Sequence, residues 1–148
     1  MSTNKVVNPS IPRTIWVLTG AAFIVALGAA VGAAARYGLT FVPALWQASS
    51  ANKEPSPIPW PTFVANVVAS FLLAIVLRRL GGNTDLVASS LAALFGAGFC
   101  GALSTMSTFM LEIVMLVRSR ATVTALGYYA LSLGSALAAF WLGIVVTA

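Results

Sequence analysis

Four long stretches without a single charged side chain constrain the fold of this chain more than any other feature. They cover residues 14–35, 55–77, 86–111 and 121–148. A helix needs about 20 mostly apolar residues to cross a bilayer, so each stretch is long enough to do so. Only 7% of the 148 residues are charged, against about 25% in a soluble domain. We therefore expect an all-α membrane protein with four transmembrane helices, located in the cell membrane.

The expected helices form one transmembrane domain over residues 1–148. We place them at about 14–37, 61–77, 86–117 and 124–146, after a loose polar tail over residues 1–13. The connector from 38 to 60 contains Trp46, and prolines at every second position from 55 to 61 favour extended backbone before the second helix. The first apolar stretch exceeds the 7–15 residues typical of a signal-peptide core, and further spans follow it, so we expect it to remain as a span.

The composition excludes most catalytic chemistry. The chain has no histidine, which rules out histidine-based catalysis and the usual zinc sites. Its three carboxylates, Glu54, Asp85 and Glu112, are far apart in the sequence, and the single Cys100 has no partner for a disulfide. The eight basic residues are scattered at helix ends and form no stripe that would bind nucleic acid. We expect neither an enzyme nor a nucleic-acid-binding protein.

The third apolar stretch contains a polar segment where lipid-facing helix would be expected. After Gly96, Gly98 and Gly101 comes the run Ser104-Thr105-Met106-Ser107-Thr108. Non-helical backbone at membrane depth is tolerated only where it is buried in protein or lines a cavity. One such hydroxyl could simply bond back to the preceding helical turn, but four hydroxyls in five positions favour a break near residues 101–106. This segment is the candidate functional site.

Two other helices carry features of interest. In the first, Gly28 and Gly32 are spaced to let another helix approach closely, and Arg36 follows them, either reaching outward to the interface or staying buried against backbone carbonyls. In the fourth, Tyr128 and Ser132 share a face next to Ser135. These hydroxyls form either a polar track or ordinary contacts between helices.

The charges at the two membrane faces are balanced. With four spans, one face receives Lys5, Arg13, Arg78 and Arg79, and the other receives Arg36, Lys53, Arg118 and Arg120. The positive-inside rule needs an excess on one side to set orientation. Four against four indicates insertion in both orientations, and two opposed copies would form an antiparallel dimer with the symmetry of inverted repeats. The alternative is a single topology fixed by one locally dominant charge.

Three segments together resemble the CrcB/Fluc family of fluoride channels. They are Gly28-x-x-x-Gly32-Ala33-x-x-Arg36-Tyr37, then Thr62-Phe63-Val64-Ala65-Asn66 with Ser70-Phe71-Leu72-Leu73, and the most specific one, Gly98-Phe99-Cys100-Gly101-Ala102-Leu103-Ser104-Thr105-Met106-Ser107-Thr108-Phe109 with Glu112. The resemblance implies a passive channel that exports fluoride from the cytoplasm and lowers its toxicity. It also implies an antiparallel dimer with two pores and a structural sodium ion on the two-fold axis.

The resemblance assigns roles to particular residues. It implies that the backbone carbonyls of Gly101 and Ser104 hold the sodium ion, and it makes Gly32 and Arg36 structural. Fluoride would be handled by residues of helices two to four, namely Asn66, Met106, Ser107, Thr108, Phe109, Tyr128 and Ser132. Met106 stands where the family has the first of two phenylalanines, and Ala102 stands where it usually has a second glycine.

The chemistry of these side chains agrees with an anion pathway. Fluoride is small and strongly hydrated, so a pore must replace water with donors without trapping the ion. Asn66 offers two amide N–H groups and each hydroxyl offers one donor, while the electropositive ring edge of Phe109 can contact an anion. Met106 has no such edge. Either the site tolerates methionine in a homodimer, or this chain pairs with a second family member that supplies the aromatic pair.

Two other functions remain open from the sequence. A proton-coupled small multidrug exporter is also a dimer of four-helix chains, but it needs a membrane-embedded carboxylate, for which Glu112 is the only candidate. A non-conducting partner subunit would account for Met106 but does not explain the polar segment in the third span.

Overall fold

A computed structural model of the chain describes residues 10–41 and 58–148, with side chains from residue 15 onward. The expected tail over residues 1–9 and most of the connector, including Trp46 and Lys53, lie outside the described residues. The described part is helical and contains no strand. Its elements are α1 (Ser10–Leu39), α3 (Trp60–Leu80), α4 (Leu86–Ala92), η1 (Ala93–Cys100), α5 (Gly101–Leu103), α6 (Met106–Arg118) and α7 (Thr122–Val146).

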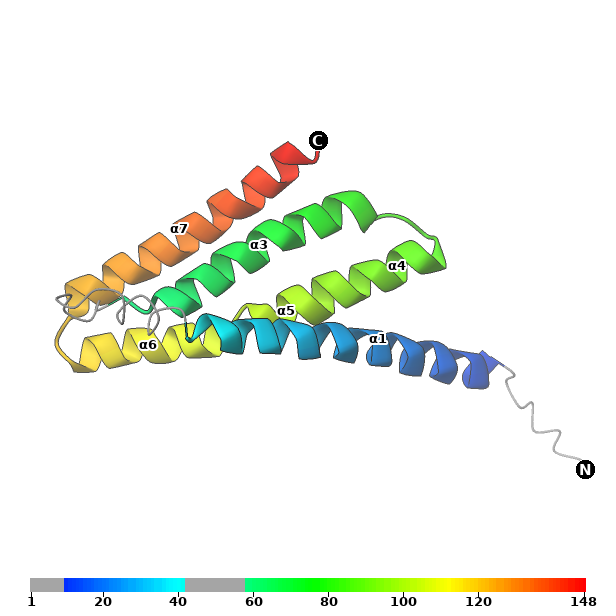
Figure 1. The fold of residues 1–148 in the computed structure, drawn as a ribbon, viewed down its shortest axis with the longest axis horizontal. Helices are drawn as coiled ribbons and strands as arrows, with labels where there is room; N and C mark the ends of the chain where they lie inside the picture. The colour runs from blue at the N-terminus through cyan, green and yellow to red at the C-terminus, as the bar shows by residue number, and fades with distance from the viewer. Residues whose placement is uncertain (1–9, 42–57) are drawn as a thin grey trace, which may run out of the picture.

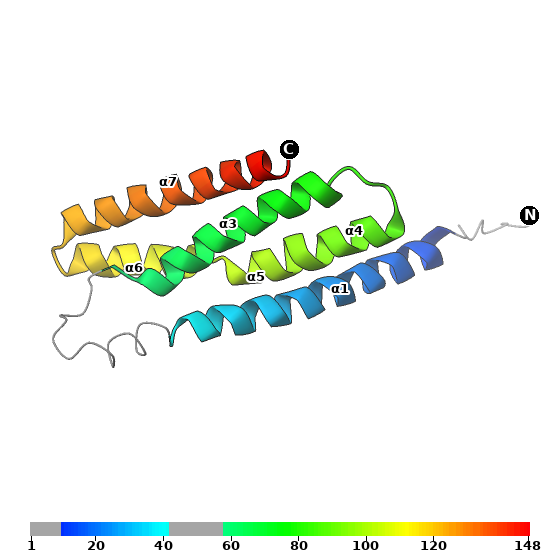
Figure 2. The same cartoon turned by 45° about the horizontal axis from the view of Figure 1, so that its top comes forward.

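These elements form four apolar segments long enough to cross a membrane, as the sequence predicts. The segments are Ile15–Leu39, Trp60–Leu80, Leu86–Arg118 and Thr122–Val146. Figures 1 and 2 show an elongated bundle in which α7 lies beside α3, the line from α4 to α5 runs between α3 and α1, and α6 lies beside the first half of α7. The α6–α7 turn lies at one end of the bundle and the α3–α4 turn at the other. The chain is therefore a multi-pass membrane protein.

The helix ends differ from the expected ones by a few residues, for local reasons. α1 already begins at Ser10, so the expectation of a loose tail is wrong for residues 10–13. Pro12 falls in the first turn of α1, where a missing N–H costs no hydrogen bond. α3 begins at Trp60 with proline in its first turn and extends to Leu80. Its last turn includes Arg78 and Arg79, whose charge is favourable at a helix C-terminus.

The third span is interrupted within the predicted region. α5 ends at Leu103, Ser104 and Thr105 adopt extended backbone, and α6 restarts at Met106. An unexpected feature precedes the break, because η1 is a π-helix of eight residues. Such i→i+5 segments are rare and occur often at functional sites.

Glycines bring α1 and η1 into backbone contact, which confirms the close approach expected from their spacing. A Cβ atom added to Gly28 would collide with the carbonyl oxygen of Leu94, and one added to Gly32 would collide with that of Phe99. From the other side, a Cβ on Gly98 would lie 2.6 Å from a carbonyl oxygen of α1. Without a hydrophobic drive between helices in lipid, such close packing holds the two segments together.

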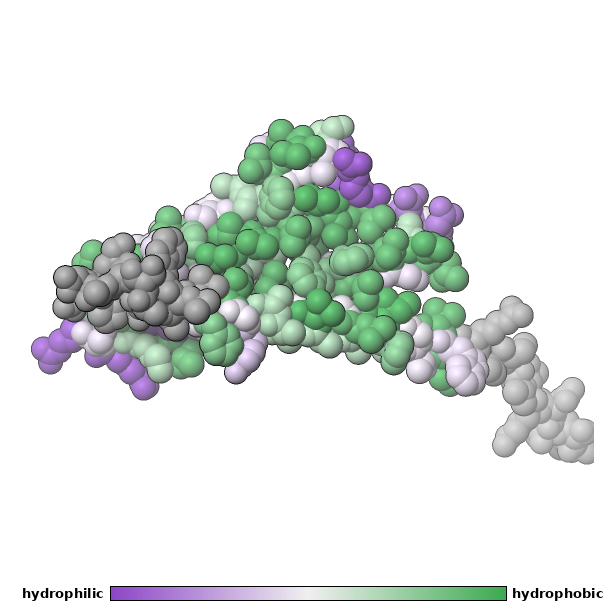
Figure 3. All heavy atoms as spheres, in the orientation of Figure 1, coloured by the Kyte–Doolittle hydropathy of each residue, from purple (hydrophilic) through white to green (hydrophobic). Residues whose placement is uncertain are grey.

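Most large apolar side chains of the described residues are exposed. The space-filling view is apolar along its middle, and hydrophilic residues gather at opposite ends of the visible face (Figure 3). The buried apolar side chains are Ala65, Ala69, Ala74, Cys100, Leu103, Phe109, Ala125 and Tyr128. Lipid or a second subunit must cover the remaining apolar surface.

Candidate functional site: the break in the third span

Asn66 of α3 binds both backbone polar groups of Thr105 at the break. The Thr105 N–H donates to Asn66 Oδ1 at 2.7 Å, and Asn66 Nδ2 donates to the Thr105 carbonyl at 3.3 Å. Because Thr105 is 7% exposed, these groups would otherwise be unpaired at membrane depth. Asn66 replaces the helical hydrogen bonds that the break removes, and it keeps one amide hydrogen for another acceptor.

A cluster of hydroxyls begins α6. Thr105 is the N-cap, and its Oγ1 accepts a hydrogen bond from the Thr108 N–H at 3.3 Å. The Thr105 hydroxyl also lies 3.3 Å from the hydroxyl oxygens of both Ser107 and Thr108. The polar run therefore restarts the helix and gathers three hydroxyls at its first turn.

Arg36 of α1 reaches this cluster across the subunit. Its Nη2 donates to Thr108 Oγ1 at 2.6 Å, and the arginine is half-buried. The sequence left open whether Arg36 would extend to the interface or bond backbone carbonyls, and its partner is instead a side-chain hydroxyl. Since Thr108 Oγ1 already accepts from Arg36 and Thr105, its own O–H proton is available to a further acceptor.

Glu112 connects three helices. Its Oε1 accepts from the Thr62 hydroxyl at 2.6 Å, and its Oε2 accepts from the Tyr128 hydroxyl at 2.9 Å. Thr62 and Tyr128 are buried, and Glu112 is half-buried. Both carboxylate oxygens thus have neutral donors. The Tyr128 proton is engaged by Glu112, so in this arrangement Tyr128 does not donate to an anion.

Phe109 lies at the centre of an aromatic group between α6 and α7. It is 6% exposed, and its ring centroid is 5.2 Å from that of Tyr128 and 6.0 Å from that of Tyr129. One turn along α7, the Ser132 hydroxyl is buried beside the Tyr128 hydroxyl but forms no well-oriented hydrogen bond among the described residues. The structure therefore brings Phe109, Tyr128 and Ser132 together.

Met106 and Ser107 do not join this group. Met106 is 65% exposed and Ser107 is also exposed on the outside of the subunit. They lie on the first turn of α6, the same turn that contains the buried cluster. The Ser107 hydroxyl lies within hydrogen-bond distance of the Thr105 hydroxyl, whereas most of the Met106 side chain is left uncovered by the described residues.

The carbonyls at the end of α5 lack their helical partners. The Ser104 N–H donates to the Cys100 carbonyl at 3.0 Å, and the Thr105 N–H donates to Asn66. The Gly101 carbonyl therefore loses the N–H four residues ahead, which would bind it in a continuous helix. Gly101 is exposed and Ser104 half-buried, so these oxygens can accept a ligand at the surface of the subunit. No group of three or more His, Cys, Asp or Glu that could hold a metal occurs in the part of the chain that is described.

Comparison with known proteins assigns this arrangement to a family. The profile of the family described as CrcB-like protein, Camphor Resistance (CrcB), matches residues 23–144. The chain belongs to the CrcB family. The matched region contains the close contact between α1 and η1, the break and the whole aromatic group.

Curated relatives of this CrcB chain have specific names. A protein of Ignicoccus hospitalis, named Fluoride-specific ion channel FluC, is 38% identical over 120 residues, which is 80% of this chain and 88% of the relative. A protein of the same name from Bordetella petrii is 40% identical over 121 residues, 81% of this chain and 85% of the relative. Fluoride-specific ion channel FluC 1 of Frankia casuarinae is 37% identical over 120 residues.

Sequence reasoning missed three connections at the CrcB site. It did not link Arg36 to Thr108, and it linked neither Thr62 nor Tyr128 to Glu112. One signal was available for Glu112, because a lone carboxylate within an apolar span requires hydrogen-bond donors nearby. No comparable signal exists for the bond between Arg36 and Thr108, whose residues lie 72 positions apart.

Proposed function

We propose that this chain forms a passive channel that conducts fluoride out of the cytoplasm and so lowers its toxicity. The observation that carries the proposal is that relatives named as fluoride-specific ion channels are 37–40% identical to it over at least 85% of their own length. The family is one of ion channels, and the chain is a membrane transport protein rather than an enzyme.

The proposed pathway follows donors that remain free at the site. Asn66 has one amide hydrogen left after bonding Thr105, and Thr108 has its hydroxyl proton left after accepting from Arg36. The bond from the arginine polarises the Thr108 hydroxyl, which makes it a stronger donor to an anion. Phe109 offers its ring edge and Ser132 its hydroxyl. These neutral donors can replace the water around fluoride, and the charge of Arg36 acts on the ion only through the Thr108 hydroxyl.

We place a second subunit against the exposed side of the break. Gly101 and Ser107 are exposed at membrane depth, where lipid cannot satisfy backbone carbonyls or hydroxyls. Water or another protein surface must cover them. The equal charge at the two membrane faces supports a partner in the opposite orientation, so the proposed assembly is an antiparallel dimer, with Met106 and Ser107 facing the partner.

The same assembly provides a site for a structural sodium ion on the two-fold axis. The Gly101 and Ser104 carbonyls would hold it, and two copies meeting at the axis would double the number of oxygen ligands. Hard cations prefer such oxygens, and the negative end of the helix dipole at α5 favours a cation there. The ion would hold the two breaks together, and the proposal assigns it no part in fluoride transfer.

Met106 leaves two versions of the assembly. In a homodimer, the methionine replaces an aromatic edge and conduction continues at an altered rate. In a heterodimer with a second family member, the partner supplies the aromatic pair. The exposed position of Met106 supports both versions. The exporter alternative receives less support, because both oxygens of Glu112 already accept hydrogen bonds from neutral hydroxyls.

Passive efflux from liposomes that contain only this purified chain tests the proposal. Fluoride and chloride electrodes would follow release after a potassium ionophore sets the membrane potential. Fast fluoride release with negligible chloride release supports a homodimeric channel, and Met106→Phe should then raise the fluoride rate. If neither ion is released, co-expression with a second family member must restore release. If fluoride is still not released with that partner present, the proposed channel function is wrong.

A further inference from the structure

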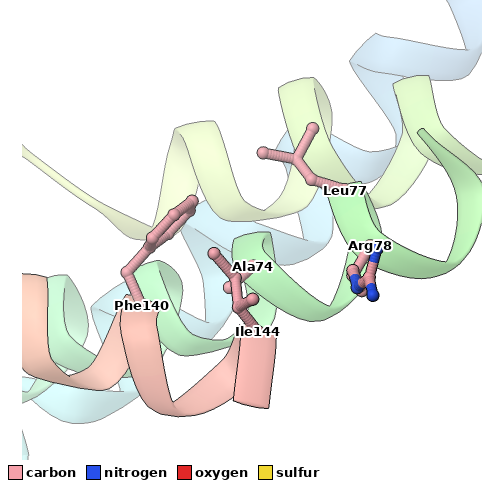
Figure 4. Close-up of a pocket in the computed structure, with 5 residues that line it drawn as sticks. All are labelled: Ala74, Leu77, Arg78, Phe140 and Ile144. Atoms are coloured by element: carbon pink, nitrogen blue, oxygen red, sulfur yellow. The ribbon is translucent and has the colours of Figure 1, made fainter. Parts of the chain in front are cut away.

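A groove between the ends of α3 and α7 lies away from the proposed pathway. It has a volume of about 300 Å³ and is lined by Ala74, Leu77, Arg78, Phe140 and Ile144. Figure 4 shows Phe140 and Arg78 at opposite ends of this groove, with Ala74 and Ile144 between them. Four of the five side chains are apolar, and the fifth is a cation.

The residues that line the groove lie at successive depths in the membrane. α3 ends at Leu80, so Arg78 is in its last turn, whereas Ala74 lies about 6 Å deeper along the helix. On α7, Phe140 is about one turn deeper than Ile144, which precedes the helix end at Val146. The groove therefore runs from an apolar end in the hydrocarbon region to a cationic end at the interface.

The packing of the two helices provides the floor of the groove. A Cβ atom on Gly143 would lie 2.7 Å from the Phe71 carbonyl oxygen and 2.8 Å from Ala74 Cβ. Contact this close leaves no room for a side chain between the helices at Gly143. The larger Phe140 and Ile144 precede and follow Gly143 along α7.

Among the residues that the structure describes, no carboxylate pairs with the arginine at the groove. Arg78 is exposed and forms no hydrogen bond or ion pair with a side chain in the described ranges, and Asp85, the acidic residue of the following turn, does not bridge to it. Arg79 beside it adds a second positive charge at the same membrane face. A basic pocket between transmembrane helices at the interface attracts anionic headgroups.

We propose that this groove binds an anionic phospholipid, with its phosphate on the Arg78 guanidinium and the upper part of an acyl chain between Phe140 and Ile144. A guanidinium binds phosphate oxygens through two parallel N–H donors. The apolar walls match a hydrocarbon chain and would not suit a free phosphate ion. The site is separate from the break, so its test does not depend on fluoride conduction.

Native mass spectrometry of the delipidated full chain titrated with phosphatidylglycerol or phosphatidylcholine tests the site. The wild type should bind phosphatidylglycerol more tightly, and Arg78→Gln should weaken that binding about fivefold. Arg78→Lys should retain a large part of it. The matched control is Arg79→Gln, which removes the same charge one residue away from the groove. Equal losses in the two glutamine variants would overturn the proposal, as would the absence of any preference in the wild type.

A second pair of variants tests the apolar part of the groove. Ile144→Trp fills it and should reduce phosphatidylglycerol binding, whereas Val145→Trp places the same ring on an exposed position of α7 and should not. If Ile144→Trp binds the lipid like the wild type, the acyl chain is not in the groove and the proposal fails. Helix content and elution volume of every variant should match the wild type, so that a loss of binding reports the site.

Discussion

Replacing Asn66 with alanine removes the connection between α3 and the break. Both hydrogen bonds to the Thr105 backbone are lost, the one at 2.7 Å and the one at 3.3 Å. Hydrogen bonds between membrane helices average about 0.6 kcal/mol each, so the bonds alone account for about 1 kcal/mol. Thr105 is buried, and leaving a buried N–H unpaired raises the cost to about 3 kcal/mol. We expect Asn66→Ala to lower the free energy of unfolding by about 1 to 3 kcal/mol.

The assay is reversible unfolding of the chain in mixed micelles, followed by circular dichroism. Ser70→Ala is the matched control, since it removes a polar group one turn along the same helix that has no hydrogen bond to the described residues. Asn66→Asp should be no more stable than Asn66→Ala, because it keeps the acceptor for the Thr105 N–H but places a carboxylate at membrane depth against the Thr105 carbonyl oxygen. A loss for Asn66→Ala no greater than that for Ser70→Ala would refute the inference that the carboxamide supports the break.

Three further predictions test other contacts. Gly32→Ala should destabilise the chain by about 1 kcal/mol or more, because its Cβ meets a backbone carbonyl oxygen, whereas Gly20→Ala has open space and should not; equal unfolding free energies would contradict the contact. Glu112→Gln places an amide donor against one of the two hydroxyls that donate to the carboxylate. We expect slower fluoride efflux and a free energy of unfolding lower by about 1 kcal/mol. If neither the efflux rate nor the unfolding free energy changes, Glu112 does not connect the three helices. Arg36→Gln and Thr108→Val should be non-additive in unfolding free energy, by about 0.5 kcal/mol or more, and additive losses would show that their bond contributes nothing.

The sequence predicted the features that depend on local composition. Uncharged stretches of sufficient length gave the four spans, and the polar run from Ser104 to Thr108 located the break. The spacing of Gly28 and Gly32 predicted a close helix contact, which η1 provides. Each of these features is present in a short window of sequence, where hydropathy and side-chain size are enough to reveal it.

The sequence did not predict features that depend on how the helices are rotated about their axes. α7 is apolar on nearly every side, so its sequence did not show that Tyr128 would face Glu112. For the same reason the choice between a polar track and contacts between helices stayed open for Ser132. The π-helical hydrogen bonds of η1 leave the hydropathy unchanged, and they form in the segment where the α1 backbone contacts Leu94 and Phe99. Roles of individual residues in handling fluoride and sodium remain predictions.

The π-helical segment also determines how this chain tolerates insertions and deletions. An i→i+5 ladder holds more residues per turn than an α-helix, so η1 resembles an α-helix with about one extra residue. Because the wider turns absorb that residue, the helix on either side of η1 keeps about the same phase around the axis. Deleting one position between 93 and 100 would keep the hydropathy and length of the span almost unchanged. It would let the segment close into an α-helix without turning the break away from Asn66, so a one-residue change in length should be tolerated better here than in the α-helical parts of the span.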